Sequence, residues 1–309
     1  MSKIPLTVVH YARFDPLRRP GGVSAFARNL RLIFEEVVFM HRKTLDAAYV
    51  EKNRLPVICD FHTVQDWPER IPLIAFLHGL ASVKWQVTHS LTDFRLARAQ
   101  SRAVRRNDVV WAACAKWISR QAKTLYGLDV RHVIYHPVDM DQFDGRLTGE
   151  NPRLILHDAR TNHKGRRLVK HLASNFSDWT FEPLRCRPEH VPERLASARA
   201  FIHLSRYEGN SLVANEAMAM NLPCLFTDVG LFRDEDGPTE VYRVETEKVF
   251  RDRTVLEREF AAFAASLDVR IYNPRIWMLR QATPEKSREG WRKVMAEFQR
   301  LSGWEGRPG

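Results

Sequence analysis

The chain has 309 residues, of which 44% are hydrophobic and 28% charged, a balance that is ordinary for a globular protein of two domains. No apolar run approaches the ~20 residues that a transmembrane helix needs, which argues against a membrane-spanning protein. The formal net charge is +11, and residues 1–150 carry +7 of it, with 22 Lys and Arg against 15 Asp and Glu. This excess predicts a polyanion, a phosphorylated substrate or an anionic membrane surface as partner, unless it serves solubility alone.

The N-terminal half has the pattern of a parallel α/β domain. The apolar segment 6–12 predicts a first strand rather than a signal peptide, and a helix is expected over 23–39 from its apolar spacing. Further buried strands are predicted at 55–61, 71–77 and 108–113, with helices near 93–106 and 115–126. A cluster of Pro and Asp residues follows, and we expect the first domain to span residues 1–148.

The alternation of strands and helices then restarts. Strands are predicted at 153–159, 199–205 and 222–228, with helices over 164–174 and 211–220. We expect residues 149–283 to form a second domain, and the amphipathic helix over about 284–301 to pack back onto the first. The fold class is therefore α/β, with two doubly wound, Rossmann-like domains. Ligands of such sheets bind beyond the carboxyl ends of the strands, here in a cleft between facing domains.

Two glutamates stand eight residues apart in the segment YEGNSLVANEAMAMNLPCLFTDVG, residues 207–230. Glu208 lies in the loop before the predicted helix and Glu216 in its second turn, while Ser211 or Asn210 is suited to cap the helix. The first N–H groups of that helix make a site for an anion. Carboxylates repel phosphate but accept hydrogen bonds from sugar hydroxyls. A nucleotide sugar carries ribose, diphosphate and hexose, and so supplies every group that this segment can bind.

The same segment resembles the E-x7-E region of the retaining, GT-B-fold glycosyltransferases of family four. Members of that family typically read E-G-F-x-L-x-x-x-E-A-M-A-x-G-x-P-V-V-A-T-D-x-G. The match covers about two dozen positions, with the A-M-A, the Pro and the T-D-x-G in register. The resemblance implies the GT-B fold and transfer of a sugar from a nucleotide sugar to a hydroxyl.

Shorter matches occur in the family's order along the rest of the chain. Gly21-Gly22 followed by VSAFARNL is similar to the glycine-rich first loop, and YHPVDMDQF (135–143) is similar to the N-P-V-D-x-x-x-F linker. DARTNHKG (158–165) resembles the G-R-x-x-x-x-K-G segment, with Ala159 in place of the Gly and a shorter Arg–Lys spacing. DFHT and AFLHGL are similar to two strand ends of the acceptor domain that carry His62 and His78.

The resemblance also implies roles for individual residues. Glu216 would hold the ribose hydroxyls and Glu208 would contact the donor sugar, while His78 would sit near the reacting sugar carbon. The catalytic residues would be Glu208, His78, Arg160 and Lys164. The donor-binding residues would be Gly21, Gly22, Arg160, Lys164, Gly209, Asn210, Ser211, Leu212 and Glu216. The family retains the anomeric configuration, and front-face attack within an ion pair is expected here.

No metal and no resident cofactor are expected. The four cysteines are scattered without ligand spacing, and no D-x-D element follows a predicted strand, so Arg160 and Lys164 would take the place of a metal at the diphosphate. The co-substrate would be a nucleotide-diphosphate sugar, with a UDP-sugar as the first expectation. Scattered, reduced thiols predict a cytoplasmic protein, in the host cytoplasm if a phage encodes it.

The acceptor stays open between two classes. The segment 92–106 carries five arginines, and Arg95, Arg98 and Arg102 would line one helix face, with His62 as a further acceptor-binding residue. Its apolar side is mostly Ala, which favours a phosphate backbone, such as duplex DNA with a hydroxymethylated base. A cell-envelope glycan or lipid, reached by peripheral association with an anionic membrane, is the alternative. A non-catalytic nucleic-acid-binding protein with a transferase fold is a third class, and the oligomeric state is open.

Overall fold

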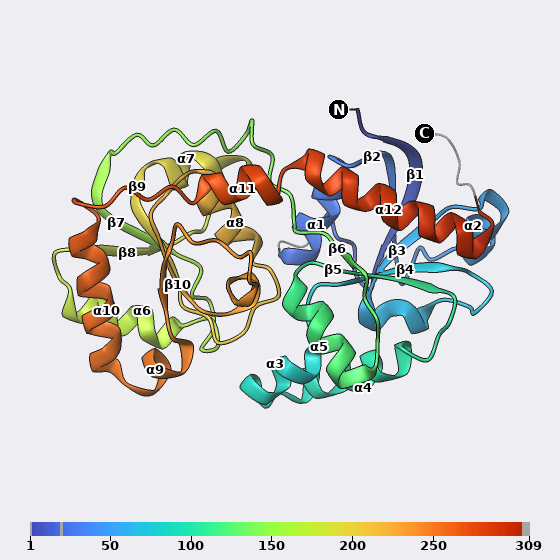
Figure 1. The fold of residues 1–309 in the computed structure, drawn as a ribbon, viewed down its shortest axis with the longest axis horizontal. Coiled ribbons are helices and arrows are strands. Elements are labelled where there is room, and N and C mark those ends of the chain that lie inside the picture. Colours follow the sequence, from blue (N-terminus) through green and yellow to red (C-terminus); the bar gives the residue numbers. More distant parts are fainter. Residues whose placement is uncertain (1, 19–20, 305–309) are drawn as a thin grey trace. The chain divides into compact units, whose positions relative to one another are not determined.

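The computed structural model describes residues 2–18 and 21–304, and the chain divides into two compact α/β units (Figure 1). The first unit comprises Met1–Pro137 together with Pro284–Gly309, and the second comprises Val138–Thr283. The C-terminal helix therefore belongs to the same unit as the N-terminal strands. No described helix is long and apolar enough to cross a membrane.

The first unit is built on a parallel sheet of six strands in the order β2-β1-β3-β4-β5-β6. Its strands are β1 (Ile4–Ala12), β2 (Phe34–His41), β3 (Val57–Asp60), β4 (Leu73–Leu77), β5 (Val109–Ala113) and β6 (His132–Val133). Its helices are α1 (Gly22–Leu30), α2 (Ala47–Asn53), the 3-10 helix η1 (Phe61–Asp66), α3 (Ala81–Thr88), α4 (Leu91–Ala103), α5 (Lys116–Tyr126) and α12 (Pro284–Ser302). Strands β3 and β4 are buried at every residue, as expected for parallel strands covered on both faces.

The segment 23–39 is not one helix, contrary to the sequence-based expectation. Helix α1 ends at Leu30, and Phe34–His41 forms the edge strand β2, which pairs in parallel with β1. The segment FEEVVFMH is rich in aromatic and β-branched residues, which favour a strand. Ile33 is buried in the turn between the two elements, so the apolar spacing of α1 continues past its end and mimics a longer helix.

Helix α12 packs on the strands β4, β5 and β6 of the first unit. Trp291 of α12 is fully buried, with its ring stacked on Phe76 and edge-on to Phe34. The Ser287 hydroxyl donates a hydrogen bond to the Tyr135 carbonyl at 3.1 Å, and the Arg288 guanidinium donates one to the Leu32 carbonyl at 2.9 Å. Apolar burial and these hydrogen bonds together fix the helix on the unit.

The second unit is built on a parallel sheet of five strands in the order β11-β10-β9-β7-β8. Its strands are β7 (Asn151–His157), β8 (Thr180–Pro183), β9 (Ala198–His203), β10 (Cys224–Thr227) and β11 (Tyr242–Val244). Its helices are α6 (Arg166–Asn175), η2 (Pro188–His190), α7 (Val191–Ala196), α8 (Leu212–Ala219), η3 (Gly230–Arg233), α9 (Thr246–Arg251), α10 (Arg253–Ser266) and α11 (Arg275–Gln281). Its core packs the sheet against α6 and α10, whose buried residues include Leu168, Phe260 and Phe263.

Each sheet reverses its strand order at one point. In the second unit the chain runs from β7 outward to β8 and returns to β9 on the other side of β7. The loops after β7 and β9 therefore diverge from neighbouring strand ends, which leaves room for side chains and ligands between them. The first unit does the same between β1 and β3. The residues that follow β7 and β9 are therefore candidates for a functional site.

Candidate functional site

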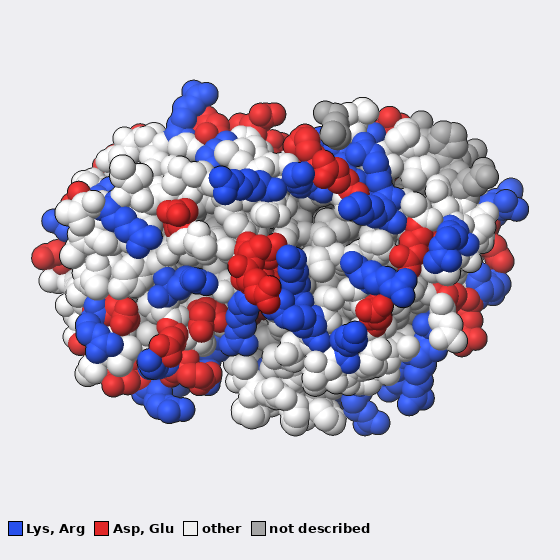
Figure 2. Space-filling view, in the orientation of Figure 1, with Lys and Arg blue, Asp and Glu red and all other residues white. Residues whose placement is uncertain are grey.

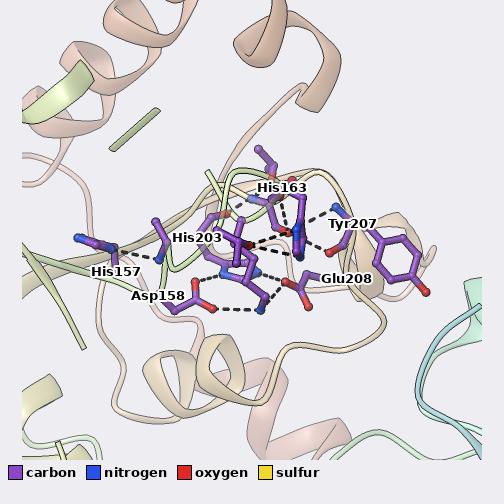
Figure 3. A network of polar contacts seen from close by, with 11 residues as sticks. His157, Asp158, His163, His203, Tyr207 and Glu208 are labelled. Carbon is purple, nitrogen blue, oxygen red and sulfur yellow. Dashed lines mark hydrogen bonds and ion pairs between the residues drawn. The ribbon is translucent and has the colours of Figure 1, made fainter. Parts of the chain in front are cut away.

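Four ionisable side chains form a closed ring at the carboxyl ends of β7 and β9 (Figure 3). His203 Nδ1 lies 2.5 Å from Asp158 Oδ1, and His203 Nε2 lies 3.2 Å from Glu208 Oε1. Lys164 Nζ lies 2.9 Å from the same Glu208 oxygen and 3.3 Å from Asp158 Oδ2. Each cation thus contacts both carboxylates. We call Asp158, Lys164, His203 and Glu208 the charge ring.

All four groups of the charge ring are ionised at neutral pH, because their mutual attraction outweighs the cost of burial. Burial disfavours the charged form of His203, but Asp158 and Glu208 raise its pKa to about 9. Burial opposes ionisation of Glu208, but Lys164 and His203 lower its pKa to about 2. Burial also opposes the charged forms of Asp158 and Lys164, yet their partners lower the pKa of Asp158 and raise that of Lys164. The charge ring is therefore neutral in sum.

A glycine lets the two loops of the charge ring approach each other. Gly165, the residue before α6, has a φ of 77°, and a Cβ there would lie 2.1 Å from the Leu204 carbonyl oxygen. Two hydrogen bonds cross at the same place, from the Arg206 N–H to the His163 carbonyl at 2.7 Å and from the Ser205 hydroxyl to that carbonyl at 3.3 Å. The loop carrying Lys164 is thereby held against the loop carrying Glu208.

The strand β10 fixes the same loop from its other side. The buried Thr227 hydroxyl donates to the Ser205 carbonyl at 2.7 Å and accepts from the Ser205 N–H at 3.0 Å. Gly230, with a φ of 63°, packs so closely that a Cβ would lie 2.9 Å from the Gly209 carbonyl oxygen. The segment 205–209 is thus held on both sides, and the position of Glu208 follows from the packing.

The remaining donor-binding candidates lie around the charge ring. Arg160 lies in the loop between β7 and α6 and is exposed. Ser211 is the N-cap residue of α8, as expected, but its side chain makes no capping hydrogen bond to the described backbone. Glu216 is half-buried on α8. Gly209 and Asn210 lie buried in the turn before α8, and Leu212 is the first residue of the helix. Asn210 Oδ1 accepts a hydrogen bond from Asn215 Nδ2 at 2.9 Å.

Sequence reasoning missed Asp158 and His203. Both lie within predicted strands, 153–159 and 199–205, and both are polar residues at the ends of mostly apolar runs, RLILHD and RAFIH. Because the carboxyl ends of neighbouring parallel strands meet at one edge, a polar residue there can face the site. A polar residue at a strand end identifies Asp158 and His203 as site residues only once β7 and β9 are known to be neighbouring strands, as they are in the structure.

The first unit has its own polar cluster, at the carboxyl ends of β3 and β4. His78 Nε2 lies 3.2 Å from Asp60 Oδ1, and His78 Nδ1 lies 3.4 Å from His136 Nε2. The rings of His78 and His136 stack at a centroid distance of 5.3 Å, and Phe26 of α1 packs edge-on to His78. Burial lowers the pKa of His136 well below its usual range. His78 is thus held between a carboxylate and a neutral imidazole.

The other candidates of the first unit lie nearby or at the surface. His62 lies in η1, two residues after Asp60, and burial lowers its pKa. Gly21 is the N-cap residue of α1 with a φ of 145°, and Gly22 is its first residue; a Cβ at either would meet no described atom within 4 Å. Nothing described in this unit therefore requires a glycine at position 22.

The arginines of segment 92–106 divide into two groups. Arg95, Arg98 and Arg102 lie on α4 and are exposed. Arg105 and Arg106 follow the helix, which ends at Ala103. The half-buried Arg106 side chain donates hydrogen bonds to the carbonyls of Trp67 and Ile71 at 3.0 and 2.8 Å. Arg106 thus has a structural role.

Within residues 2–18 and 21–304, no group of three or more His, Cys, Asp or Glu side chains is arranged to hold a metal ion.

Comparisons with known proteins show what this chain resembles. Residues 156–256, which contain the whole charge ring, match the family model of the group 1 glycosyl transferases. Sucrose-phosphate synthase from Thermosynechococcus elongatus is similar in structure, with a TM-score of 0.70 at 15% identity over 96% of this chain and all of that one. The chain has the GT-B fold. The resemblance to GT-B glycosyltransferases of the family-four kind is confirmed.

Two further solved structures share the fold. HepE of Anabaena in complex with UDP and glucose has a TM-score of 0.66 at 13% identity, over 94% of this chain and 99% of that one. The lipopolysaccharide outer core galactosyltransferase WaaB has a TM-score of 0.60 at 11% identity, with the same coverage of 94% and 99%. Among curated proteins, none matches this chain.

Proposed function

We propose that the protein is a retaining, metal-independent glycosyltransferase that moves a sugar from a nucleotide-diphosphate sugar to a hydroxyl acceptor. The single observation that carries the proposal is the charge ring, which presents an ammonium and a carboxylate side by side at the strand-order reversal of a GT-B sheet. Lys164 and Glu208 are the accessible members of the ring, with side-chain exposures of 29% and 14%. A diphosphate and a sugar hydroxyl are the two groups that such a pair binds.

The chemistry follows from the charges that develop during transfer. Breaking the sugar–phosphate bond leaves positive charge on the sugar ring and negative charge on the diphosphate. Lys164, Arg160 and the first N–H groups of α8 stabilise the leaving diphosphate, since all three supply positive charge or N–H donors to it. Glu208 accepts from the donor sugar and Glu216 binds the ribose hydroxyls, and the family resemblance assigns His78 a role at the reacting carbon. Attack from the same face within the ion pair retains the configuration, and the two glutamates are binding groups rather than an acid and a nucleophile.

A UDP-sugar is the first candidate for the donor. The GT-B protein HepE is described with UDP and glucose and with UDP-glucose, which supports this choice by analogy of fold. Gly22 would let the backbone approach the phosphates of any nucleotide-diphosphate sugar, because it has no side chain and a Cβ there would meet no described atom within 4 Å. A cytoplasmic location, where nucleotide sugars are made, belongs to the same proposal.

Titration calorimetry with UDP, GDP, ADP and their sugars tests the donor site directly. Glu216→Ala should weaken donor binding about tenfold or more, because it removes one or two charge-assisted hydrogen bonds, while Glu208→Ala should mainly slow turnover. Activity should survive EDTA. Unchanged affinity and turnover in both variants would overturn the site, and a strict requirement for Mg²⁺ or Mn²⁺ would overturn the metal-independent mechanism.

For the acceptor we propose a glycan or a lipid of the cell envelope, which the protein reaches by binding to an anionic membrane surface. At the tip of the helical pair α3–α4, Leu91 is 74% exposed, and the exposed rings of Trp85 and Phe94 lie 5.4 Å apart beside Arg95 and Arg98. Apolar rings flanked by cations suit a bilayer surface better than a phosphate backbone. On the face shown in Figure 2, lysines and arginines are scattered among acidic and uncharged residues rather than gathered into one basic patch.

Duplex DNA is the second candidate acceptor, and the row Arg95, Arg98 and Arg102 is the observation that favours it. A salt titration of DNA binding, run beside flotation on vesicles of phosphatidylglycerol and phosphatidylcholine, separates the two. A DNA acceptor predicts log affinity falling with log salt at about −0.9 per phosphate contacted, with a slope about two units shallower in Arg98→Ala/Arg102→Ala. The membrane proposal predicts flotation that Trp85→Ser/Phe94→Ser abolishes. DNA binding without flotation would reverse the choice.

A further inference from the structure

The charge ring has a buried half and an accessible half. The side chains of His203 and Asp158 are 1% and 5% exposed, against 29% for Lys164 and 14% for Glu208. Only Lys164 and Glu208 can therefore touch a ligand. Asp158 and His203 act on a ligand solely through the two accessible members.

Lys164 Nζ contacts both Glu208 and Asp158, so a movement of Nζ out of the charge ring toward a diphosphate would lengthen both contacts. If Lys164 were the sole cation at this place, its departure would leave the buried Asp158 and the partly buried Glu208 without a charged partner, which is costly. His203 contacts the same two carboxylates through its two ring nitrogens. Each carboxylate thus keeps one cationic partner when Lys164 leaves.

We propose that His203 is a positioning residue, the internal counter-ion of Asp158 and Glu208, which frees Lys164 to bind the diphosphate of a nucleotide-sugar donor; this inference rests on the proposed function. Asp158 orients the imidazolium by accepting from Nδ1, so that Nε2 faces Glu208. The titratable groups that face His203 are Asp158 from the loop after β7 and Glu208 from the loop after β9, with Lys164 across the ring. From β10, His203 meets the uncharged ring of Phe226.

The proposal predicts opposite effects for two neighbouring variants. His203→Gln keeps a hydrogen-bond donor but removes the charge, so both carboxylates hold Lys164 and the dissociation constant of the nucleotide diphosphate should rise about tenfold. Asp158→Asn removes one of the two carboxylates that hold Lys164 but keeps a side-chain oxygen that can accept from His203 Nδ1, so the affinity should not fall. The double variant Asp158→Asn/His203→Gln should recover most of the affinity that His203→Gln loses. A merely structural role predicts that both single variants weaken binding and that the double variant is worst.

The experiment is titration calorimetry at pH 7.5 with whichever of UDP, GDP, ADP and dTDP binds the wild-type protein most tightly, with melting temperatures to show that each variant is folded. In the wild type the affinity should also fall as the pH rises through about 9, where His203 loses its proton. His203→Gln should lack that step. Equal affinity of His203→Gln and wild type, or a loss in Asp158→Asn as large as in His203→Gln, would overturn the inference.

Two controls keep the outcome interpretable. Lys164→Ala tests the proposed function itself: if it leaves the affinity unchanged, or if no diphosphate binds the wild type, the proposed function fails together with this inference. If Lys164→Ala weakens binding and His203→Gln does not, this inference alone fails. If His203→Gln does not fold, the ¹⁵N chemical shifts of the wild-type imidazoles at pH 7.5 provide the test, because they report how many ring nitrogens carry a proton. A His203 ring with only one proton would contradict the proposal.

Discussion

Two buried histidines, His10 of the first unit and His203 of the second, lie on strands of similar parallel sheets but in opposite electrostatic surroundings. His10 lies within β1, fully buried, with its ring edge-on to Phe26 and Phe39, and burial lowers its pKa to about 4 although Asp60 opposes this. His203 ends β9, equally buried, and its contacts with Asp158 and Glu208 hold its pKa at about 9. Burial alone therefore does not set the charge of a histidine here; direct contact with carboxylates does.

The difference also suggests separate tasks for the two units. The second unit arranges two cations and two carboxylates as fixed charges, which suits a ligand whose charge changes during reaction. The first unit surrounds His78 with aromatic rings, the neutral His136 and the single carboxylate Asp60. On the proposed function, these surroundings would suit an uncharged part of the substrate.

The largest effect should come from separating the two loops of the charge ring. Gly165→Ala places a Cβ against the Leu204 carbonyl at a positive φ, and strain and overlap together should destabilise the second unit by about 4 kcal/mol. Gly149→Ala is the matched control, because Gly149 has a φ of 67° but open space around it, and should cost about 1 kcal/mol. Chemical denaturation of both variants measures this. Equal costs would show that the close approach at Gly165 is unimportant.

The next largest effect concerns the accessible cation of the charge ring. Lys164→Ala should lower turnover on the order of 10²-fold, comparable to removing one preorganised donor to a developing oxyanion, and Arg160→Ala should act in the same direction. Lys170→Ala, on the exposed side of α6, is the control and should leave turnover unchanged. Steady-state rates of sugar transfer or donor hydrolysis provide the measurement. Normal turnover of the Lys164→Ala variant would contradict a catalytic role for the charge ring.

The charged histidine should make the second unit sensitive to alkali. Because the pKa of His203 is raised on folding, its contribution to stability is complete below about pH 6.5 and is lost as the pH rises through about 9. The loss between pH 7 and pH 9.5 should be about 2 kcal/mol. Hydrogen exchange resolved by peptides should show faster opening of the second unit at pH 9.5. If β7 and β9 exchange no faster relative to the first unit, the assigned charge of His203 is wrong.

The neutral histidine should make the first unit sensitive to acid, by a similar or smaller amount. The pKa of His10 is lowered on folding, so the unfolded state binds a proton below about pH 6.5 that the folded state does not, and about 2 kcal/mol of stability is lost by pH 5. Both ring nitrogens of His10 lack a hydrogen-bond partner among the described residues. His10→Phe should therefore fit among the aromatic rings and flatten the pH dependence between 7 and 5. Thermal unfolding at both pH values tests this, and an unchanged slope would contradict it.

The sequence by itself determined the features whose signal is local. Parallel strands buried on both faces appear as apolar runs, so β4 and β5 were found within about two residues of their ends. Glu208, Glu216 and the start of α8 lie within one short segment, so their order and spacing could be read directly. The same local signal failed at Phe34–His41, because Ile33 extends the apolar spacing of α1 into the strand that follows.

Only the tertiary structure decided which distant residues meet. Asp158 and His203 are 45 residues apart, and they face each other because the chain passes through β8 before β9 returns to the other side of β7. Gly165 has to be glycine because of Leu204, on a different strand end. Strand order and loop packing depend on the balance of contacts across the whole unit, and no short pattern of residues encodes them. The two glutamates could therefore be read from the sequence, whereas the cations that hold Glu208 required the fold.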